Sequence, residues 1–351
     1  MASSKGPLAV EPLYLPRMIP WGIRLLRALM PQCRVAVTQG LRYLNERALL
    51  AYTPLLEAAE CASFFQARGS IFVYSDERTF AAAIRETGFL RSSGVQVEVL
   101  TAEQVKSLEP AVDGQISGGL FFSGNGHCVD PFALGCRFAQ AIESRGGEII
   151  AAKADKLTRS DHGWTVSTGA GAFDAANVVV AAGYQSDRLL RPLGYTMPLQ
   201  SERGYHLMLP QSGVSLSRPV AVAEHGLIAT PMNKGLRLAG TSEFASEKTP
   251  LNEKRADLLF EHAKQVFSDL NRSGASRWLG NRPMLPDSLP AIGRARRHPG
   301  LLYNFGHHHL GLTHAAVSAS VLSDVLFGRA DSFVDTKFNL SRFGKFVGMK
   351  S

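Results

Sequence analysis

The sequence lacks several signatures that mark common protein classes. It has four cysteines in 351 residues and no CxxC pair, so a paired-cysteine metal site is not indicated, and we expect free thiols in a reducing cytoplasm. No apolar run reaches the roughly 20 residues that cross a bilayer, and the first residues show no signal-peptide pattern. HExxH and GxSxG are also missing, which excludes the corresponding zinc-protease and serine-hydrolase motifs.

Strong clustering of positive charge is missing as well. Lys and Arg number 38 and Asp and Glu 30, for a formal net charge of +8. The basic residues are scattered, and the only small cluster is at Arg294, Arg296, Arg297 and His298. Without a long basic run, we predict no nucleic-acid partner. An anionic substrate or cofactor accounts equally well for the excess.

One short segment is amphipathic. Residues 21–30, WGIRLLRALM, mix apolar residues with two arginines. We expect a buried amphipathic helix here, and a helix lying on a membrane surface is the alternative. The predicted location is therefore cytoplasmic, with peripheral contact at the inner face of the plasma membrane left open.

Helix and strand patterns alternate along the chain. Residues 40–65 return apolar residues every three or four positions, which predicts a helix interrupted at Pro54. Four short strands between residues 199 and 245 predict an antiparallel sheet. Strands alternate with helices in the sequence before and after this predicted sheet, so two domains interleaved in sequence are expected. Further helices are predicted at 77–90, 101–109, 131–147, 252–270 and 313–328, and further strands at 70–75, 95–100, 148–153, 163–173, 177–183 and 300–306.

Two strand-to-helix turns stand out. The strand NVVVAAG, expected to be buried, ends in Gly183 and runs directly into a helix-like segment. The strand GLLYNFG leads through three histidines to a helix whose N-terminus carries Thr313. A helix start presents free N–H groups and a positive dipole, which favour an electron-rich or anionic ligand such as a cofactor ring.

The three histidines do not predict a metal site. On an extended strand His307 and His309 share a face and His308 points away, and no carboxylate lies at ligand spacing. Histidines that fill a polar gap at a strand end, or that line the wall of a pocket, remain the alternatives.

Five stretches of the chain resemble the family of FAD-dependent D-amino-acid oxidases and dehydrogenases, most of all the bacterial D-amino-acid dehydrogenases. Their order and spacing carry the resemblance. They are GHCVDPFALGCRFAQAIESRGG, NVVVAAGYQSDRLLRPLGYTMPLQSERGYHLMLP, GLIATPMNKGLRLAGTSEF, GNRPMLPDSLPAIG and YNFGHHHLGLTHAA.

The resemblance implies an α/β fold in which an FAD-binding, Rossmann-like domain, incomplete at its N-terminus, is interleaved with an α+β substrate domain that contains an antiparallel sheet. The FAD-binding domain would comprise residues 127–192 and 281–330. The substrate domain would comprise residues 13–126 and 193–280, followed by a C-terminal tail at 331–351.

The resemblance also implies a site. The residues that would contact FAD are Ala182, Gly183, Gly306, His307, Gly311, Leu312 and Thr313. Arg282 would bind the substrate carboxylate as a bidentate guanidinium; a surface ion pair is its alternative. His309 would face the substrate, and Tyr205 would add a hydroxyl, unless it is simply a core residue.

The implied activity is oxidation of the CH–NH2 group of an amino acid, most of all a D-amino acid, to a 2-oxo acid and ammonia, with oxygen or a quinone as electron acceptor. In this family no side-chain base is generally required, so positioning of the substrate carries the reaction.

The sequence departs from the family in two places. No GxGxxG occurs anywhere, and we expect that roughly seventy residues with the opening βαβ unit are absent. His308 stands where the family usually has Gly, and we expect its side chain to crowd the turn or reach solvent. A noncatalytic remnant that acts as a binding protein is therefore an alternative. A flavin oxidase of another amine, such as glycine, sarcosine, proline or a modified tRNA base, is a second.

Overall fold

The computed structural model describes residues 6 and 8–343, which form two compact units. Unit 1 consists of the described residues up to 11 together with 61–136 and 203–280, and unit 2 of 12–60, 137–202 and 281–343. Each unit is assembled from three separate stretches of chain. The predicted α/β class with interleaved parts is thus confirmed.

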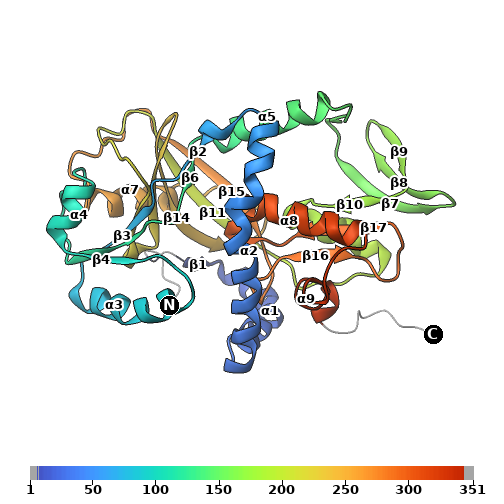
Figure 1. Cartoon of the computed structure of the whole chain (residues 1–351), viewed down its shortest axis with the longest axis horizontal. Helices are drawn as coiled ribbons and strands as arrows, with labels where there is room; N and C mark the ends of the chain where they lie inside the picture. The colour runs from blue at the N-terminus through green and yellow to red at the C-terminus, as the bar shows by residue number, and fades with distance from the viewer. Residues whose placement is uncertain (1–5, 7, 344–351) are drawn as a thin grey trace. The chain divides into compact units, whose positions relative to one another are not determined.

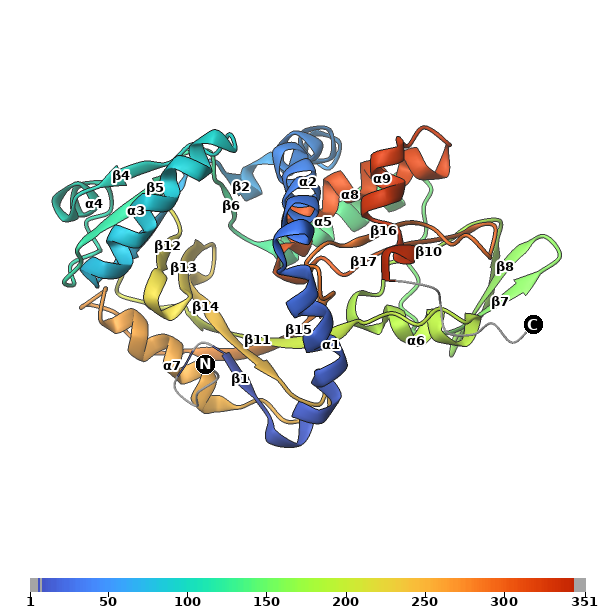
Figure 2. The same cartoon turned by 90° about the horizontal axis from the view of Figure 1, so that it is seen from below.

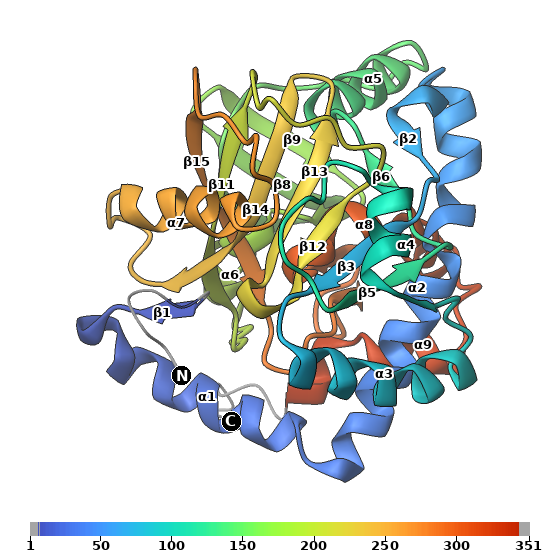
Figure 3. The same cartoon turned by 90° about the vertical axis from the view of Figure 1, so that its left-hand side faces the viewer.

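A mixed sheet of nine strands dominates unit 1 (Figures 2 and 3). Its path is β15-β11-β14-β13-β12-β3-β5-β4, and β1 pairs with β14. The four strands β11, β14, β13 and β12, which pair antiparallel in this order, are the predicted antiparallel sheet. The strands are β1 (Leu8–Val10), β3 (Ser70–Tyr74), β4 (Glu98–Leu100), β5 (Gly118–Phe122), β11 (Gln200–Leu209), β12 (Val220–Val222), β13 (Leu227–Met232), β14 (Gly235–Phe244) and β15 (Ser276–Met284).

Helix α7 (Glu253–Lys264) covers one face of this sheet (Figure 3). Its apolar residues, among them Leu259, pack with Leu207 and Leu238 in the buried core of unit 1. The amphipathic spacing of α7 explains this packing, because residues three and four apart share one helix face. The remaining elements are α3 (Glu77–Ser92), α4 (Ala102–Leu108), β2 (Phe65–Gln66) and β6 (His127–Cys128).

Unit 2 is built on a three-stranded sheet of order β10-β17-β16. Helix α8 (Gly311–Leu326) follows β17 and lies beside α2 (Pro31–Ala58), as Figure 1 shows. Leu44 of α2 shares an apolar core with Val317 and Val321 of α8. The other elements are β10 (Val178–Val180), β16 (Ala291–Arg294), β17 (Leu301–Phe305), α1 (Leu15–Ala28), α6 (Ser186–Leu190), α9 (Ser332–Lys337) and the hairpin strands β7 (Ala154–Ser160), β8 (Gly163–Thr168) and β9 (Gly171–Ala175). Helix α5 (Pro131–Glu143) begins in unit 1 and ends in unit 2.

The packing of α2 on α8 groups residues 12–60 with unit 2, whereas the predicted domains placed them with 61–126. Residues 331–343 also belong to unit 2, where α9 packs on β16, and the rest of the predicted tail lies outside the described residues. Assignment of flavin to one unit and substrate to the other remains a prediction.

Several local predictions were wrong. Helix α2 continues through Pro54 to Ala58, although proline cannot donate the N–H bond of that position. Residues 148–153 form no strand, since no described strand pairs with them. Strand β10 is buried on one face only, with Val179 exposed and Val180 buried. The expected burial of residues 21–30 holds for Trp21 but not for Ile23 and Leu26.

Candidate active site

Two parallel strands of unit 2 end at the same sheet edge. Strands β10 and β17 are neighbours, with Val180 opposite Tyr303. Their carboxyl ends therefore bring the turns at Gly183 and Gly306 to one edge, where open α/β sheets bind ligands. The structure thus brings together two groups of predicted cofactor contacts that are more than a hundred residues apart in sequence.

The turn after β10 leaves its backbone open. Gly183 has φ +56°, and a Cβ atom there would meet nothing within 4 Å. Ala182 is exposed and lines a pocket of about 360 Å³. The pocket is lined by Lys153, Ala154, Asp155, Ala182, Gln185, Arg188 and Leu189. Lys153 lies 4.0 Å from the carboxylate of Asp155 in this lining. With Arg188, the lining keeps one more basic than acidic side chain near an open backbone, which favours an anionic group.

The turn after β17 is closely packed. Gly306 has φ +84°, and a Cβ atom there would lie 2.5 Å from Cδ1 of Leu285. The ring of His307 is within hydrogen-bond distance of Ser318, with Nε2 and Oγ 2.8 Å apart. Burial, followed by the nearby His314, lowers the pKa of His307 to about 4. His307 is therefore a neutral, fixed ring beneath the turn rather than a charged group.

The start of α8 presents backbone to solvent. Leu310, its N-cap residue, makes no side-chain capping bond, and Gly311, Leu312 and Thr313 are exposed. Tyr52 of α2 donates a hydrogen bond to the Leu312 carbonyl oxygen. Helix α2 thus holds the first turn of α8 through Tyr52, while the N-terminus of α8 remains open to a ligand.

A second support comes from the same pair of helices. Nε2 of His314, in the first turn of α8, lies 2.7 Å from Oδ1 of Asn45 on α2. Burial lowers the pKa of His314 to about 4, so its neutral ring donates to the amide oxygen. Both contacts fix α8 where the predicted cofactor contacts begin.

A polar cluster lies next to the histidine turn. We define the Glu202 cluster as Glu202, Arg282, His308 and His309. Nη1 of Arg282 is 3.1 Å from Oε1 of Glu202, and Nε2 of His308 is 3.3 Å from Oε2 of the same carboxylate. The two histidine rings contact each other through their Nδ1 atoms. The predicted catalytic residues Arg282 and His309 thus belong to one cluster, in which Arg282 already has a carboxylate partner.

Of the two expectations for His308, a crowded turn or a side chain in solvent, the second is wrong. It adopts φ +57°, and its side chain turns onto Glu202 with 16% of its area exposed. The three histidines lie in the 3-10 turn η6 (His308–Leu310) and its N-cap rather than on an extended strand. Burial lowers the pKa of His308 to about 4, and the charge of Glu202 opposes that shift.

His309 is neutral for similar reasons. Burial lowers its pKa, the positive charge of Arg282 lowers it further, and Glu202 raises it. A neutral imidazole can accept a proton. Because Nδ1 faces His308, its Nε2 atom is the one that remains for a ligand.

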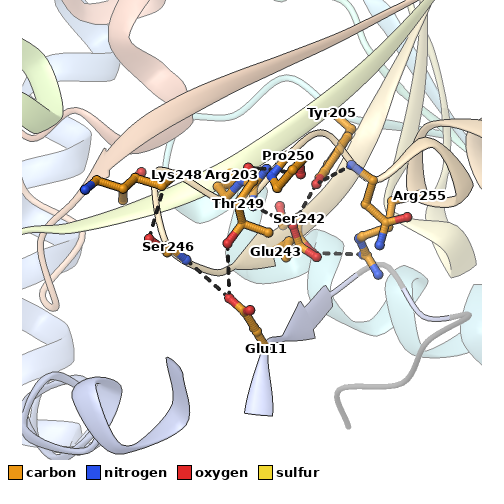
Figure 4. A network of polar contacts seen from close by, with 12 residues as sticks. Glu11, Arg203, Tyr205, Ser242, Glu243, Ser246, Lys248, Thr249, Pro250 and Arg255 are labelled. Atoms are coloured by element: carbon orange, nitrogen blue, oxygen red, sulfur yellow. Dashed lines mark hydrogen bonds and ion pairs between the residues drawn. The ribbon is translucent and has the colours of Figure 1, made fainter. Parts of the chain in front are cut away.

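Tyr205 lies in unit 1, within a buried polar network (Figure 4). It is 1% exposed, and its hydroxyl donates to Oε2 of Glu243 at 2.7 Å. Arg203 lies 3.2 Å from the same oxygen and donates to the carbonyl oxygens of Thr249 and Pro250. The structure gives Tyr205 a place in the core, and its predicted contact with substrate remains a prediction.

Sequence reasoning missed the residues that hold the site from outside the quoted turn. Glu202 was not singled out, although a charged residue in a strand is a signal of an ion pair. Asn45, Tyr52 and Ser318 gave no signal, because their roles depend on how α2 and α8 pack. Among the described residues, no group of three or more His, Cys, Asp or Glu is placed to hold a metal ion.

The residues present fit the ring end of a flavin. The N-terminus of α8 has no side-chain cap, and a Cβ atom on Gly311 would meet only the Cβ of His307, at 4.0 Å. A flavin held there would find backbone N–H donors, and Gly183 offers open backbone at the same sheet edge. Gly311, Leu312 and Thr313 would hold the ring, and Ala182 and Gly183 another part of FAD.

The chain is similar in sequence and in fold to known proteins. A family described as FAD dependent oxidoreductase, DAO, matches residues 21–325. A D-amino-acid oxidase of Bradyrhizobium diazoefficiens is 33% identical, over 96% of this chain and 82% of its own. A D-amino acid dehydrogenase of Cereibacter sphaeroides is 29% identical, over 98% and 80%. The crystal structure of glycine oxidase from Geobacillus kaustophilus superposes with a TM-score of 0.74 at 22% identity, over 85% of this chain and 81% of that one.

Proposed function

Because the chain belongs to the DAO family of FAD dependent oxidoreductases, we propose that it oxidises the CH–NH2 group of a D-amino acid to a 2-oxo acid and ammonia. The single observation that carries the choice of an amino acid is the Glu202 cluster. There the guanidinium of Arg282 and the ring of His308 contact the same carboxylate, and the neutral ring of His309 contacts His308.

Arg282 is proposed to bind the substrate carboxylate. Its side chain is 26% exposed, so a carboxylate from solvent can reach it, and a guanidinium can form two parallel hydrogen bonds to such a group. Glu202 holds one side of the guanidinium at Nη1. This contact fixes the direction from which a carboxylate binds, and so the orientation of the substrate Cα–H bond.

His309 is proposed to accept a proton from the ammonium group of the substrate. A D-amino acid in water carries an ammonium group, which must lose a proton before the C–N bond can be oxidised. With a lowered pKa, His309 is neutral at pH 7 and can accept that proton at Nε2. FAD, when bound, supplies the electron acceptor for the hydride that leaves Cα. Water then converts the released imine to the 2-oxo acid and ammonia.

The D configuration is supported by the relatives named above, a D-amino-acid oxidase and a D-amino acid dehydrogenase. Oxygen or a quinone is the proposed acceptor of electrons from the flavin, and the cytoplasm the proposed location. No helix of the described chain is both long and apolar enough to span a bilayer.

The first test is incubation of the purified chain with FAD, followed by desalting and a visible spectrum. Retained flavin absorbance is expected. The loaded protein is then assayed for 2-oxo acid with matched D- and L-amino acids, glycine, N-methylglycine, L-proline and modified tRNA. Turnover confined to D-amino acids supports the proposal. Turnover of another amine would replace the substrate, and absence of bound flavin would favour a noncatalytic binding protein.

A further inference from the structure

A partly buried guanidinium in unit 1 has no partner. Arg237 lies on β14, and its Nε atom is buried without a hydrogen-bond acceptor. No described residue forms a hydrogen bond or an ion pair with its side chain. The buried arginines Arg203 and Arg255 of the same unit each donate to backbone carbonyl oxygens. A charge taken out of water without compensation is strongly unfavourable, so an external anion is the expected partner of Arg237.

Arg237 lies on the face of the sheet that α7 does not cover. The leucine on either side of it in sequence belongs to the apolar core packed against α7, and successive side chains of a strand point to opposite faces. His206 of β11 pairs with Ala239, two residues beyond Arg237, so the His206 ring lies on the same face as the guanidinium. This ring stacks on the ring of Trp278 of β15, with the centroids 4.8 Å apart.

A second unpaired polar atom lies in the same environment. His127 of β6 has a buried Nδ1 atom without a hydrogen-bond partner. The N–H of Asn233, in the hairpin that joins β13 to β14, donates to the carbonyl oxygen of Val129 at 3.0 Å. This bond brings the residues after β6 next to the hairpin from which Arg237 extends. Buried polar atoms are rarely left unpaired, so two in one environment indicate a ligand.

The two histidines of this environment are neutral. Burial lowers the pKa of His127, and the charges of Arg68 and Arg237 lower it further. Burial, followed by the charge of Arg237, lowers the pKa of His206 to about 4. Each neutral ring offers one N–H donor. We define the Arg237 cluster as Arg68, His127, His206 and Arg237.

The charge of the cluster is not compensated by its acidic neighbours. Burial raises the pKa of the Cys128 thiol, so this neighbour of Arg237 stays uncharged. Asp130, whose charge also acts on Cys128, accepts the N–H of Ala133 at the start of α5. No described carboxylate forms an ion pair with a member of the Arg237 cluster. The cluster therefore combines a positive charge with neutral donors.

We propose that the Arg237 cluster binds the carboxylate of a small organic molecule, with the Arg237 guanidinium as its charge partner and the rings of His127 and His206 as further donors. A guanidinium forms two parallel hydrogen bonds to a carboxylate. One partly buried guanidinium matches the single charge of a carboxylate better than the nearly double charge of a phosphate. Trp278, which is 54% exposed, offers an apolar surface for the body of the ligand.

Such a carboxylate has two sources. One is the side chain of the amino acid that is oxidised, and the other is a separate ligand of unit 1. The cluster itself does not depend on the proposed flavin chemistry. Binding is therefore measured first without FAD, and the source of the carboxylate afterwards with FAD.

The test is isothermal titration of the full chain carrying Arg282→Ala, which removes the other proposed carboxylate contact. Phenylacetate, its neutral amide phenylacetamide and inorganic phosphate are titrated at pH 7. Phenylacetate should bind more tightly than phosphate, and phenylacetamide should not bind. Adding Arg237→Gln should weaken phenylacetate binding by about ten- to a hundredfold, as expected for hydrogen bonds to a charged group. The matched control is Arg85→Gln, which removes an exposed arginine of α3 in the same unit and should change nothing.

Arg237→Met distinguishes a ligand site from a structural role. It replaces an uncompensated charge with an apolar side chain, so the melting temperature without ligand should stay the same or rise, while phenylacetate binding is lost. A clearly lower melting temperature would overturn the proposal. So would amide binding equal to that of the acid, tighter binding of phosphate, or an equal loss in the Arg85→Gln control. Loss of FAD retention in Arg237→Gln would assign the cluster to the phosphates of FAD instead.

The source of the carboxylate follows from kinetics of the FAD-loaded chain with Arg282 intact. If Arg237→Gln lowers kcat/KM for D-glutamate but not for D-glutamine, the carboxylate is the side chain of the substrate. If neither value changes while phenylacetate still binds through Arg237, the cluster takes a separate ligand. Both results support the site. Absence of turnover with any amino acid would count against the proposed function, and the titration would still test the cluster.

Discussion

Arg282 and Glu202 form an ion pair in which Nη1 and Oε1 are 3.1 Å apart, and the carboxylate is the more buried partner, with 8% of its side chain exposed. A guanidinium proposed to bind substrate is thus already held by the protein on one side. The pair positions Arg282 but also competes with the substrate for its charge. The two effects predict opposite changes in KM when Glu202 loses its charge.

Arg282→Ala removes the proposed carboxylate contact. The KM for D-amino acids should rise by about a hundredfold, since charge-assisted bidentate contacts contribute about 3 kcal/mol, while the visible flavin spectrum stays unchanged. Steady-state kinetics of the FAD-loaded enzyme measure this. Arg277→Ala is the matched control, because Arg277 lies on the same strand and pairs with Asp257 in unit 1. An unchanged KM in Arg282→Ala rules out the carboxylate role.

Glu202→Gln keeps the shape of the side chain and removes its charge. If competition dominates, the KM for a carboxylate substrate should fall by up to about tenfold, because Arg282 no longer faces a negative charge. If positioning dominates, the KM should instead rise toward the value of Arg282→Ala. The same kinetic assay, run on both variants, decides which effect of the pair is larger.

The strand and helix patterns were strong predictors of the architecture. The short strands between residues 199 and 245, separated by turn residues, predicted the antiparallel strands of unit 1. The turn after β17 was placed correctly because glycine and the following apolar helix mark it in sequence. The role of Glu202 could not be predicted, because its partners Arg282 and His308 lie 80 or more residues further along the chain. The contact with His308 also depends on the unusual φ of that residue. The roles of Tyr52 and Asn45 likewise depend on packing between α2 and α8, which no local pattern encodes.

Tyr205→Phe separates a core role from a substrate role. Loss of the hydroxyl leaves Oε2 of Glu243 without one donor, so unfolding free energy should fall by about 1–3 kcal/mol. If the tyrosine has only this core role, kcat and KM at a temperature well below the melting point should not change. Urea titration and kinetics on the same preparation measure both. A large rise in KM with unchanged stability would restore the predicted substrate contact.

Gly306 and Gly311 should respond in opposite ways to alanine. Gly306→Ala introduces a side chain at φ +84° and a clash with Leu285, so stability should fall by about 1–3 kcal/mol. Gly311 has φ −54° and no close neighbour, so its alanine variant should be as stable or more stable. Because Gly311 lies at the proposed flavin contact, that variant should nonetheless bind FAD more weakly. Unweakened FAD binding would move the flavin away from the start of α8.

Acid should destabilise the chain through its buried histidines. The pKa of His314 falls from 6.5 to about 4 because of burial, so the unfolded chain binds a proton between these pH values and the folded chain does not. The contribution of His314 to the free energy of unfolding is complete above pH 6.5. It is lost as pH falls toward 4, by up to about 3 kcal/mol. Burial also lowers the pKa of His307 to about 4, so the stability it contributes is lost over the same fall in pH. Urea unfolding from pH 7 to pH 4 should show this slope, and His314→Gln, which can still donate to Asn45, should make it shallower. An unchanged slope in that variant would assign the pH dependence to other groups.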